Sequence, residues 1–295
     1  MAKEVPVAGV SRLHKRRNST SLKKRKTSSP RKRGKKKKFS SKGTPRWLIY
    51  LLAAFIILFF ILVFYYFFIR PYSYRWKSCY GFREYDICMP FGYQVHGMDI
   101  SRYQGKINWA DLKLNQSQRY PLQFVFIKAT EGGDFKDINF NDNFESARKH
   151  GIVRGAYHFY IPSTPPEKQA DFFINTVKLD SGDLPPVLDV EVMSKNGPEE
   201  LRKNLKIWLD KVEGHYKVKP ILYTSFKFKT RFLSDSTFNS YPYWIAHYYV
   251  DSVAYQGEWK FWQHTDRALV PGIPDRVDLN IFNGSLRELT EMTLR

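Results

Sequence analysis

Two carboxylates stand two residues apart in the apolar run from Leu184 to Val192, which reads Leu-Pro-Pro-Val-Leu-Asp-Val-Glu-Val. In a strand, Asp189 and Glu191 project to the same face, because side chains alternate and the two Cα atoms are about 7 Å apart. A strand buried on both faces has no structural use for two acids. Paired carboxylates, one of which stays protonated, catalyse glycoside hydrolysis. The alternative is that both acids lie past the strand end, where they cap a helix or form ion pairs.

Further acidic residues lie in other candidate strands. Asp99 falls at the C-terminal end of the first strand and Asp278 in the last one. Barrel enzymes place their sites at the C-terminal ends of the strands, so we expect these acids to meet the first pair there. The candidate catalytic residues are therefore Glu191, Asp189, Asp99 and Asp278.

Aromatic and polar residues occupy matching places along the strands. A sugar ring presents an apolar face of C–H groups, and flat aromatic side chains bind it together with a few directed hydrogen bonds. Each aromatic side chain alone is more often a core residue than a ligand contact, so their convergence on the acids carries the prediction. The candidate substrate-binding residues are Tyr157, His158, Tyr223, Trp244, Tyr248, Trp262 and Gln263.

Short β-rich runs that alternate with helical stretches must position these residues, a pattern typical of βα units and a parallel sheet. After Pro220 the helical patterns become short, so we expect the second half to be irregular. The predicted fold is α/β, an irregular (β/α) TIM-like barrel preceded by one transmembrane helix. The candidate strands are Val95 to Ile100, Phe124 to Thr130, Ile152 to Phe159, Val187 to Val192, Pro220 to Tyr223, Tyr243 to His247, Lys260 to His264 and Val277 to Phe282.

The charge is concentrated at the N-terminus. Residues 1–46 hold 18 of the 48 Lys and Arg residues and one of the 28 acids, whereas the rest of the chain is nearly balanced. This segment has almost no large apolar residues, so we predict a basic, disordered cytoplasmic tail. Its charge is explained as a topology signal that contacts anionic lipid, at about 1 kcal/mol per basic residue, and nucleic acid is not expected as a partner. The alternative, a regulator whose tail binds DNA, predicts a salt-sensitive complex.

An apolar run of 23 residues, Trp47 to Ile69, follows the tail. As a helix it would span about 34 Å, enough to cross a bilayer once. A cleaved signal peptide is the competing interpretation, but the run is long, rich in Phe and followed by Arg70-Pro71 without a small-residue cleavage site. The basic excess before the span predicts a cytoplasmic N-terminus and a C-terminal domain on the outer side.

The two cysteines, Cys79 and Cys88, lie in the connector after the span. In an exported domain, two cysteines this close in sequence are expected to form a local disulfide. A metal site would need more ligands than the nearby His96, so neither a metal nor a cofactor is predicted. The chain thus divides into a tail (1–46), a membrane-spanning helix (47–69), a connector (70–92) and a catalytic barrel (93–295).

Taken in order, the motifs from Tyr93 to Asn283 resemble glycoside hydrolase family 25, the muramidases (lysozymes) that cut bacterial peptidoglycan. The order of several motifs carries the resemblance, because any one alone would be weak. The matching segments are Gly97-Met98-Asp99-Ile100-Ser101 with Tyr103-Gln104-Gly105 and Trp109, Phe126-Ile127-Lys128-Ala129-Thr130-Glu131-Gly132, Gly155-Ala156-Tyr157-His158-Phe159, Leu188-Asp189-Val190-Glu191, Leu222-Tyr223-Thr224, Trp244-Ile245-Ala246, Phe261-Trp262-Gln263 and Val277-Asp278-Leu279-Asn280.

The resemblance implies an enzyme that hydrolyses the β-1,4 bond between N-acetylmuramic acid and N-acetylglucosamine in peptidoglycan glycan strands. It assigns Glu191 as the general acid, which requires a raised pKa. Asp189 would stay ionised and either orient the 2-acetamido group for internal attack or activate water. Asp99 and Asp278 would hold sugar and partner side chains.

Other residues of the motifs receive supporting roles. Tyr157 and Tyr223 are expected to line the site, and Glu131 to be structural, paired with Lys128 or capping a loop. With the membrane anchor, the resemblance predicts a single-pass protein of a bacterial inner (cytoplasmic) membrane, its catalytic domain periplasmic or extracellular. Cutting would then be confined to cell wall near the membrane. No oligomeric state is predicted.

Two alternatives compete with this interpretation. Family 18 glycosidases carry an Asp-x-x-Asp-x-Asp-x-Glu strand, but when they are aligned on Asp189 and Glu191 the two earlier acids fall on Val187 and Leu184. A catalytically silent, membrane-tethered scaffold that binds peptidoglycan is the second alternative. The presence of all four acids weighs against it, because binding alone does not need the acid.

Overall fold

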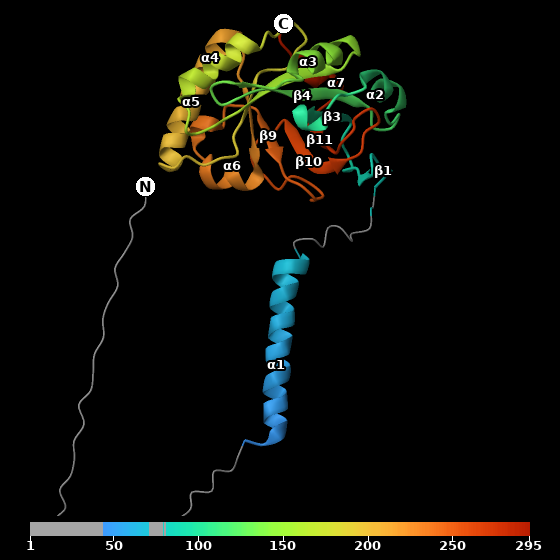
Figure 1. Cartoon of the computed structure of the whole chain (residues 1–295), viewed down its shortest axis with the longest axis vertical. Helices are drawn as coiled ribbons and strands as arrows, with labels where there is room; N and C mark the ends of the chain where they lie inside the picture. Colours follow the sequence, from blue (N-terminus) through green and yellow to red (C-terminus); the bar gives the residue numbers. More distant parts are fainter. Residues whose placement is uncertain (1–43, 71–78, 80) are drawn as a thin grey trace, which may run out of the picture. The chain divides into compact units, whose positions relative to one another are not determined.

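The computed structural model describes residues 44–70, 79 and 81–295 of the chain (Figure 1). The predicted basic tail up to residue 43, and the connector at 71–78 and 80, lie outside the described residues. The chain divides into two units, Met1–Leu62 and Val63–Arg295.

The first described element is an apolar helix. Helix α1 (Arg46–Phe64) continues into the π-helical turn η1 (Tyr65–Ile69). Nearly all of its large apolar side chains are exposed, a surface that is unfavourable in water. By length and composition, the 24 residues Arg46–Ile69 suffice to cross a membrane once, as the sequence pattern predicts.

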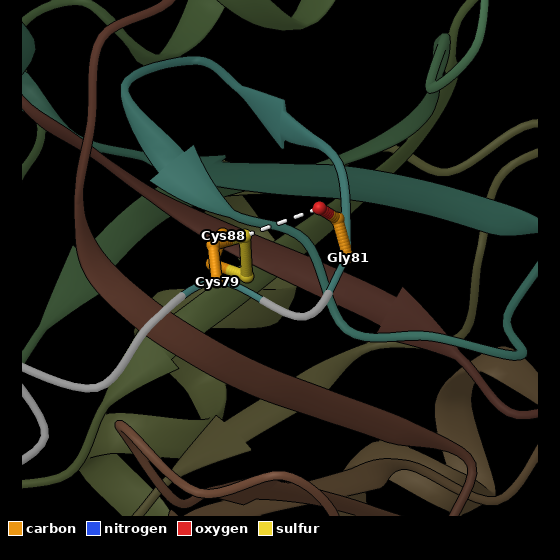
Figure 2. Close-up of a disulfide and its surroundings, with 3 residues drawn as sticks. All are labelled: Cys79, Gly81 and Cys88. Carbon is orange, nitrogen blue, oxygen red and sulfur yellow. Dashed lines mark hydrogen bonds between the residues drawn. A yellow bond between two sulfur atoms is a disulfide. The ribbon is translucent and has the colours of Figure 1, made fainter.

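A small hairpin precedes the barrel strands. Strands β1 (Arg83–Glu84) and β2 (Ile87–Cys88) pair antiparallel. A disulfide joins Cys79 to Cys88, and the Cys79 sulfur lies 3.4 Å from the carbonyl oxygen of Gly81 (Figure 2). The covalent bond therefore ties Cys79 to the second strand of the hairpin, and both lie within the predicted connector (70–92).

Tyr85, in the turn of this hairpin, attaches it to the barrel domain. Its hydroxyl donates to the carbonyl oxygen of Tyr120 at 2.9 Å, and its own carbonyl accepts from the Leu269 amide at 2.8 Å. Its ring is buried. The hairpin is thus part of the folded domain.

Eight strands close into a barrel, as predicted. Their order is β3-β11-β10-β9-β8-β7-β6-β4, and pairing of β3 with β4 closes the ring. The short strand β5 (Phe135–Lys136) extends β4 as a hairpin. The barrel strands are β3 (Val95–Ile100), β4 (Leu122–Glu131), β6 (Val153–Phe159), β7 (Val187–Asp189), β8 (Ile221–Ser225), β9 (Tyr243–Ala246), β10 (Phe261–Ala268) and β11 (Val277–Phe282).

Two features of the strands differ from the prediction. The fourth strand ends at Asp189 instead of Val192, so Glu191 lies beyond the sheet. Strand β11 runs antiparallel to both of its neighbours, whereas the βα pattern predicted parallel strands throughout. The other adjacent pairs around the ring are parallel.

Helices cover the outside of the barrel, and α4 and α5 pack side by side (Figure 1). The apolar residues between Pro198 and Tyr216 recur at helical spacing, which predicts a helix over this range with one buried face. Helix α5 has these bounds and buries that face. The helices after β8 are short, which also agrees with the sequence. The helices are α2 (Trp109–Asn115), α3 (Phe140–Lys149), α4 (Pro166–Thr176), α5 (Pro198–Tyr216), α6 (Phe226–Phe232) and α7 (Leu286–Glu291), with 3₁₀ turns η3 (Arg102–Gln104) and η4 (Ser236–Phe238).

The strands separate two apolar cores, one inside the barrel and one between the barrel and its helices. Large rings fill the inside, among them Phe124 and Phe126. Gly97 and Gly155 make room for them, because a Cβ at either position would lie within 2.7 Å of one of these rings. Aromatic packing thus fills the barrel interior up to the C-terminal ends of its parallel strands.

Candidate active site

A layer of polar side chains lies at the C-terminal end of the barrel, the end at which the parallel strands have their carboxyl termini. Side chains facing the interior alternate along each strand, so the last inward position of several strands contributes to one layer. In β3, for example, Val95 and Gly97 precede Asp99 on the same face, and in β7 Val187 precedes Asp189. This layer brings together acids that are far apart in the sequence.

Asp278 joins this layer because β11 is antiparallel. In the register between β3 and β11, Asp278 stands opposite Asp99. Near the start of an antiparallel strand, a residue lies at the same end of the barrel as residues near the ends of the parallel strands. Burial raises the pKa of both carboxyls, and the charge of Asp99 raises the pKa of Asp278 further. Two adjacent buried carboxylates repel each other, which favours protonation of one of them.

Gln263 connects these acids to two tyrosines. Its Nε2 donates to Asp99 Oδ1 at 2.7 Å and to Asp278 Oδ2 at 3.1 Å. Its Oε1 accepts from the hydroxyls of Tyr223 at 2.7 Å and Tyr248 at 2.6 Å. All hydrogen-bonding capacity of this buried amide is therefore used, and its orientation is fixed by its neighbours.

Asn280 connects Asp99 to the aromatic rings inside the barrel. Its Nδ2 donates to Asp99 Oδ1 at 2.7 Å, and its Oδ1 accepts from Trp244 Nε1 at 2.8 Å. The Trp244 ring in turn stacks on Phe126 and meets Tyr223 edge on, with ring centroids 4.4 Å apart in each case. The acid layer thus rests on a floor of aromatic rings.

Asp189 is buried, and the charge of Lys128 acts on its carboxyl. One of its carboxyl oxygens, Oδ1, is buried without a hydrogen-bond partner. Burial and the charge of Glu191 raise the pKa of Asp189 well above its ordinary range, while Lys128 lowers it. Lys128 donates to Glu131 Oε2 at 2.7 Å, which is one of the two roles that the sequence predicts for Glu131. An unsatisfied buried carboxyl oxygen is costly, which marks Asp189 as a candidate functional group.

Glu191 is the solvent-exposed acid of the set. The chain leaves the sheet just before it, after the Val190 amide donates to the Tyr223 carbonyl at 2.9 Å. Partial desolvation raises the pKa of Glu191, and a hydrogen bond with Tyr223 and the charge of Lys128 oppose this rise. An acid that is both accessible and biased toward its protonated form can transfer a proton to a bound molecule.

Tyr157 completes the inward layer. It pairs with Lys128 in the register between β6 and β4, and its ring packs edge on against Trp244 at 6.4 Å. Burial raises the pKa of Tyr157, and the charges of Asp99 and Asp189 raise it further. The structure therefore places Tyr157, Tyr223, Tyr248, Trp244 and Gln263 around the acids, and their contact with substrate stays a prediction.

His158 does not belong to this group. It follows Tyr157 on β6 and faces the opposite side, where its ring contacts Thr130 at 2.7 Å and Gln169 at 3.1 Å and stacks on Trp208. Burial lowers its pKa to about 4. The predicted substrate contact is therefore wrong for His158, which is a core residue beneath the helices.

Trp262 is the second such correction. It precedes Gln263 on β10 and points outward, where its Nε1 donates to the His247 carbonyl at 2.8 Å and its ring contacts Tyr93 and Trp259. It is fully buried. Strand alternation separates Trp262 from its neighbour Gln263, and a sequence in which both faces are apolar does not reveal which residue faces inward.

Two site residues, Lys128 and Asn280, were not selected from the sequence. Each had a signal. Lys128 is the one basic residue in the apolar run of β4, and Asn280 follows Asp278 at the spacing that places both on one face. Among residues 44–70, 79 and 81–295, no three His, Cys, Asp or Glu side chains are grouped so as to hold a metal ion.

An α/β barrel with converging carboxyl groups at the C-terminal ends of its strands has the architecture of acid-catalysed glycoside hydrolases. Residues 98–273 match Glycosyl hydrolases family 25. The chain belongs to this family and is a glycoside hydrolase.

Relatives and solved structures extend over the same region. The uncharacterized protein YegX of Escherichia coli (strain K12) is 43% identical over 214 residues, 71% of this chain and 78% of that protein. Lysozyme M1 of Streptomyces globisporus is 32% identical over 216 residues, 66% of this chain and 70% of that protein. A family 25 glycosyl hydrolase from Bacillus anthracis has a TM-score of 0.63 and 31% identity, covering 74% of this chain and 99% of that one. A bacterial lysozyme from Streptomyces coelicolor has a TM-score of 0.61 and 32% identity, covering 68% of this chain and 96% of that one.

Proposed function

We propose that this protein is a membrane-anchored muramidase that hydrolyses the β-1,4 bond between N-acetylmuramic acid and N-acetylglucosamine in peptidoglycan. The observation that carries the proposal is the pairing of one accessible acid, Glu191, with three acids embedded in the barrel end, Asp99, Asp189 and Asp278. Family membership and the similarity to Lysozyme M1 support the choice of substrate.

Glu191 is assigned as the general acid. It donates its proton to the glycosidic oxygen while the bond from that oxygen to the sugar C1 breaks, and water supplies the hydroxyl at C1 and a proton that restores the acid. Its position beyond the end of β7 leaves it open to a long glycan strand. Its raised pKa favours the protonated form that the first step requires.

Asp189 is assigned to the acetamido group or to the attacking water. Burial of Asp189 acts against the ionised form that the family resemblance implies, and Lys128 acts in its favour. A substrate N–H group that donates to the unpartnered carboxyl would shift the balance toward the ionised form. Internal attack by the acetamido group gives retention at C1, whereas direct attack by water gives inversion, so the anomer first formed identifies the route.

The deeper network has a supporting role. Asp99 and Asp278 hold Gln263, and Gln263 holds the hydroxyls of Tyr223 and Tyr248. Such a network keeps polar side chains near the substrate in one arrangement. Together with Trp244 and Tyr157, the two tyrosines offer aromatic faces and hydroxyls suited to a sugar.

The test is digestion of purified peptidoglycan by the full-length chain in detergent, with mass spectrometry of the released reducing ends. We expect reducing-end muramic acid from the wild type, none from Glu191→Gln, and wild-type release from Glu199→Gln, which alters an exposed acid on α5. Binding of glycan without release by the wild type would contradict the proposal and favour a tethered binding scaffold.

We also propose that the apolar helix Arg46–Ile69 anchors the protein in a bacterial inner membrane. The basic residues before the helix support a cytoplasmic location of segment 1–46, against anionic lipid, with the connector (70–92) and the catalytic barrel (93–295) on the outer side. Protease added to spheroplasts should degrade the barrel and spare a tag at residue 1. The reverse pattern, or recovery of the protein in the soluble fraction, would contradict the anchor.

A further inference from the structure

The short turn η3 lies at the active-site end of the barrel and is tied to the chain on both sides. It follows β3, the strand that carries Asp99. The backbone amide of Arg102 donates to Asp137 Oδ2 at 2.8 Å, just after the β4–β5 hairpin. Gln104 Nε2 donates to the carbonyl oxygen of Arg276 at 3.1 Å, just before β11. Since β4 and β11 are the two neighbours of β3, the turn presents its side chains from a fixed backbone at the rim of the site.

The guanidinium of Arg102 lies over two aromatic rings at this rim. Its central carbon is 4.9 Å from the ring centroid of Tyr103 and 4.3 Å from that of Phe135, which lies on β5. Its Nη2 also donates to the Tyr103 hydroxyl at 3.2 Å. A guanidinium that stacks on aromatic faces keeps its N–H donors in its own plane, where they can bind another group. The rings therefore hold the cation and leave most of its donors unused.

Arg102 is a cation without an acidic partner. Among the residues that the structure describes, no carboxylate forms an ion pair with its guanidinium. The carboxyl of Asp137 accepts instead from the backbone amides of Arg102 and Asn139. Arg154 differs, because its Nε donates to Asp183 at 2.7 Å. A planar cation with spare donors is suited to bind a carboxylate through two parallel hydrogen bonds.

The group next to this cation suits a sugar. Tyr103 is 68% exposed, so its ring stays open to a ligand beside the guanidinium. An aromatic ring can bind the C–H face of a sugar, and the adjacent cation can bind an acidic substituent of it. Muramic acid combines these two features, because its sugar ring carries a lactyl carboxyl group to which peptides with further carboxylates are attached. A cation at the rim also offsets the repulsion between such a ligand and the acids of the site.

We propose that Arg102 binds a carboxylate carried by the muramic acid residues of peptidoglycan, either that of the lactyl group or one of the attached peptide. Tyr103 and Phe135 hold the guanidinium in place for this contact. The inference rests on the proposed function, since it adds a residue that sets specificity for the same substrate. The enzyme then prefers strands with free carboxylates over the same strands after amidation.

The test uses full-length protein in detergent and soluble, uncrosslinked peptidoglycan strands, before and after their carboxyl groups are amidated with a carbodiimide and ammonia. We expect Arg102→Gln to raise KM about fivefold at unchanged kcat. Amidation should raise KM similarly for wild type and leave Arg102→Gln unchanged. Lys136→Gln is the matched control, because Lys136 is an exposed cation next to Phe135 on β5, and this variant should behave as wild type.

Strands from which the peptides have been removed separate the two sources of the carboxylate. An effect of amidation on these strands assigns the contact to the lactyl group, and an effect confined to intact strands assigns it to the peptide. If amidation raises KM equally in wild type and Arg102→Gln, or in neither, the inference is wrong.

A second arm measures binding without turnover. The affinity of the same strands is determined for Glu191→Gln alone and combined with Arg102→Gln. Weaker binding of free strands by the double variant, with equal binding of amidated strands, supports the inference and shows that the variant is folded. Equal binding of free strands overturns it. Failure of the wild type to release muramic acid would instead overturn the proposed function, and the binding comparison would still decide whether Arg102 recognises a carboxylate.

Discussion

Asp99 and Asp278 stand directly opposite each other in the register between β3 and β11, and the side-chain amide of Gln263 donates to both. This relationship depends on the antiparallel course of β11. In a parallel strand, a residue one position from the strand start would lie at the far end of the barrel. The reversal of one strand therefore completes the acid cluster.

Asn280→Ala should destabilise the barrel and disturb the acids above it. It removes a donor to Asp99 and leaves Trp244 Nε1 buried without an acceptor, at a cost of about 1–3 kcal/mol in the free energy of unfolding. It should also raise the pKa of Asp99, because the Asn280 hydrogen bond lowers it. Thermal unfolding beside Asn283→Ala, an exposed asparagine, gives the comparison, and equal melting temperatures would contradict it.

Asp189→Asn should abolish hydrolysis while it stabilises the fold at neutral pH. The raised pKa of Asp189 means that its protonated form contributes stability at low pH, below the pKa of the unfolded chain. This contribution is lost as pH rises through the folded-state pKa, whereas Asn stays neutral. The melting temperature of the variant should exceed that of wild type at pH 7, and the gap should narrow toward pH 4. A variant less stable at pH 7 would refute this account.

The buried His264 should weaken the fold in acid. Burial, with a contribution from His96, lowers its pKa to about 3. Its stability contribution is complete above the ordinary histidine pKa and is lost as pH falls toward the folded-state value. Relative to His264→Phe, wild type should lose roughly 3 kcal/mol of unfolding free energy between about pH 7.5 and pH 4.5. The stability contribution of the site acids depends on pH in the opposite direction, because their pKa values are raised. Wild type and His264→Phe both contain these acids, so their contribution cancels in the difference. A constant difference in stability across this range would exclude the effect.

Trp262→Phe should affect stability more than catalysis. The indole bond to the His247 carbonyl lies outside the barrel, so its loss costs about 1 kcal/mol without moving an acid. Trp244→Phe, by contrast, frees Asn280 beneath Asp99 and should lower the turnover rate. Rates per folded molecule, measured on peptidoglycan, separate the two substitutions. If both substitutions lowered the rate equally, the outward-facing Trp262 would also support the site, which would contradict this prediction.

Much of this architecture is readable from local patterns. The eight strand positions follow from apolar runs and the bounds of α5 from helical spacing. The acids Glu191, Asp189, Asp99 and Asp278 stand out because they interrupt apolar runs, and their catalytic roles stay predictions. These signals are local because an apolar residue or an unexplained acid stands out against its immediate neighbours. The Cys79–Cys88 bond, closed over a short stretch of chain, belongs to the same kind of information.

The inward or outward direction of each side chain was not readable in this way. Side chains alternate between the two faces of a barrel strand, but both faces are apolar, so the sequence does not show which of them points into the barrel. For this reason His158 and Trp262 were assigned to the wrong face. The irregular register of β4 between Lys128 and Thr130 shifts that phase within a single strand. The direction of β11 and the contacts of Gln263 depend on partners far away in the sequence. Closure of the barrel sets both, because only there do Asp99, Gln263 and Asp278 become neighbours.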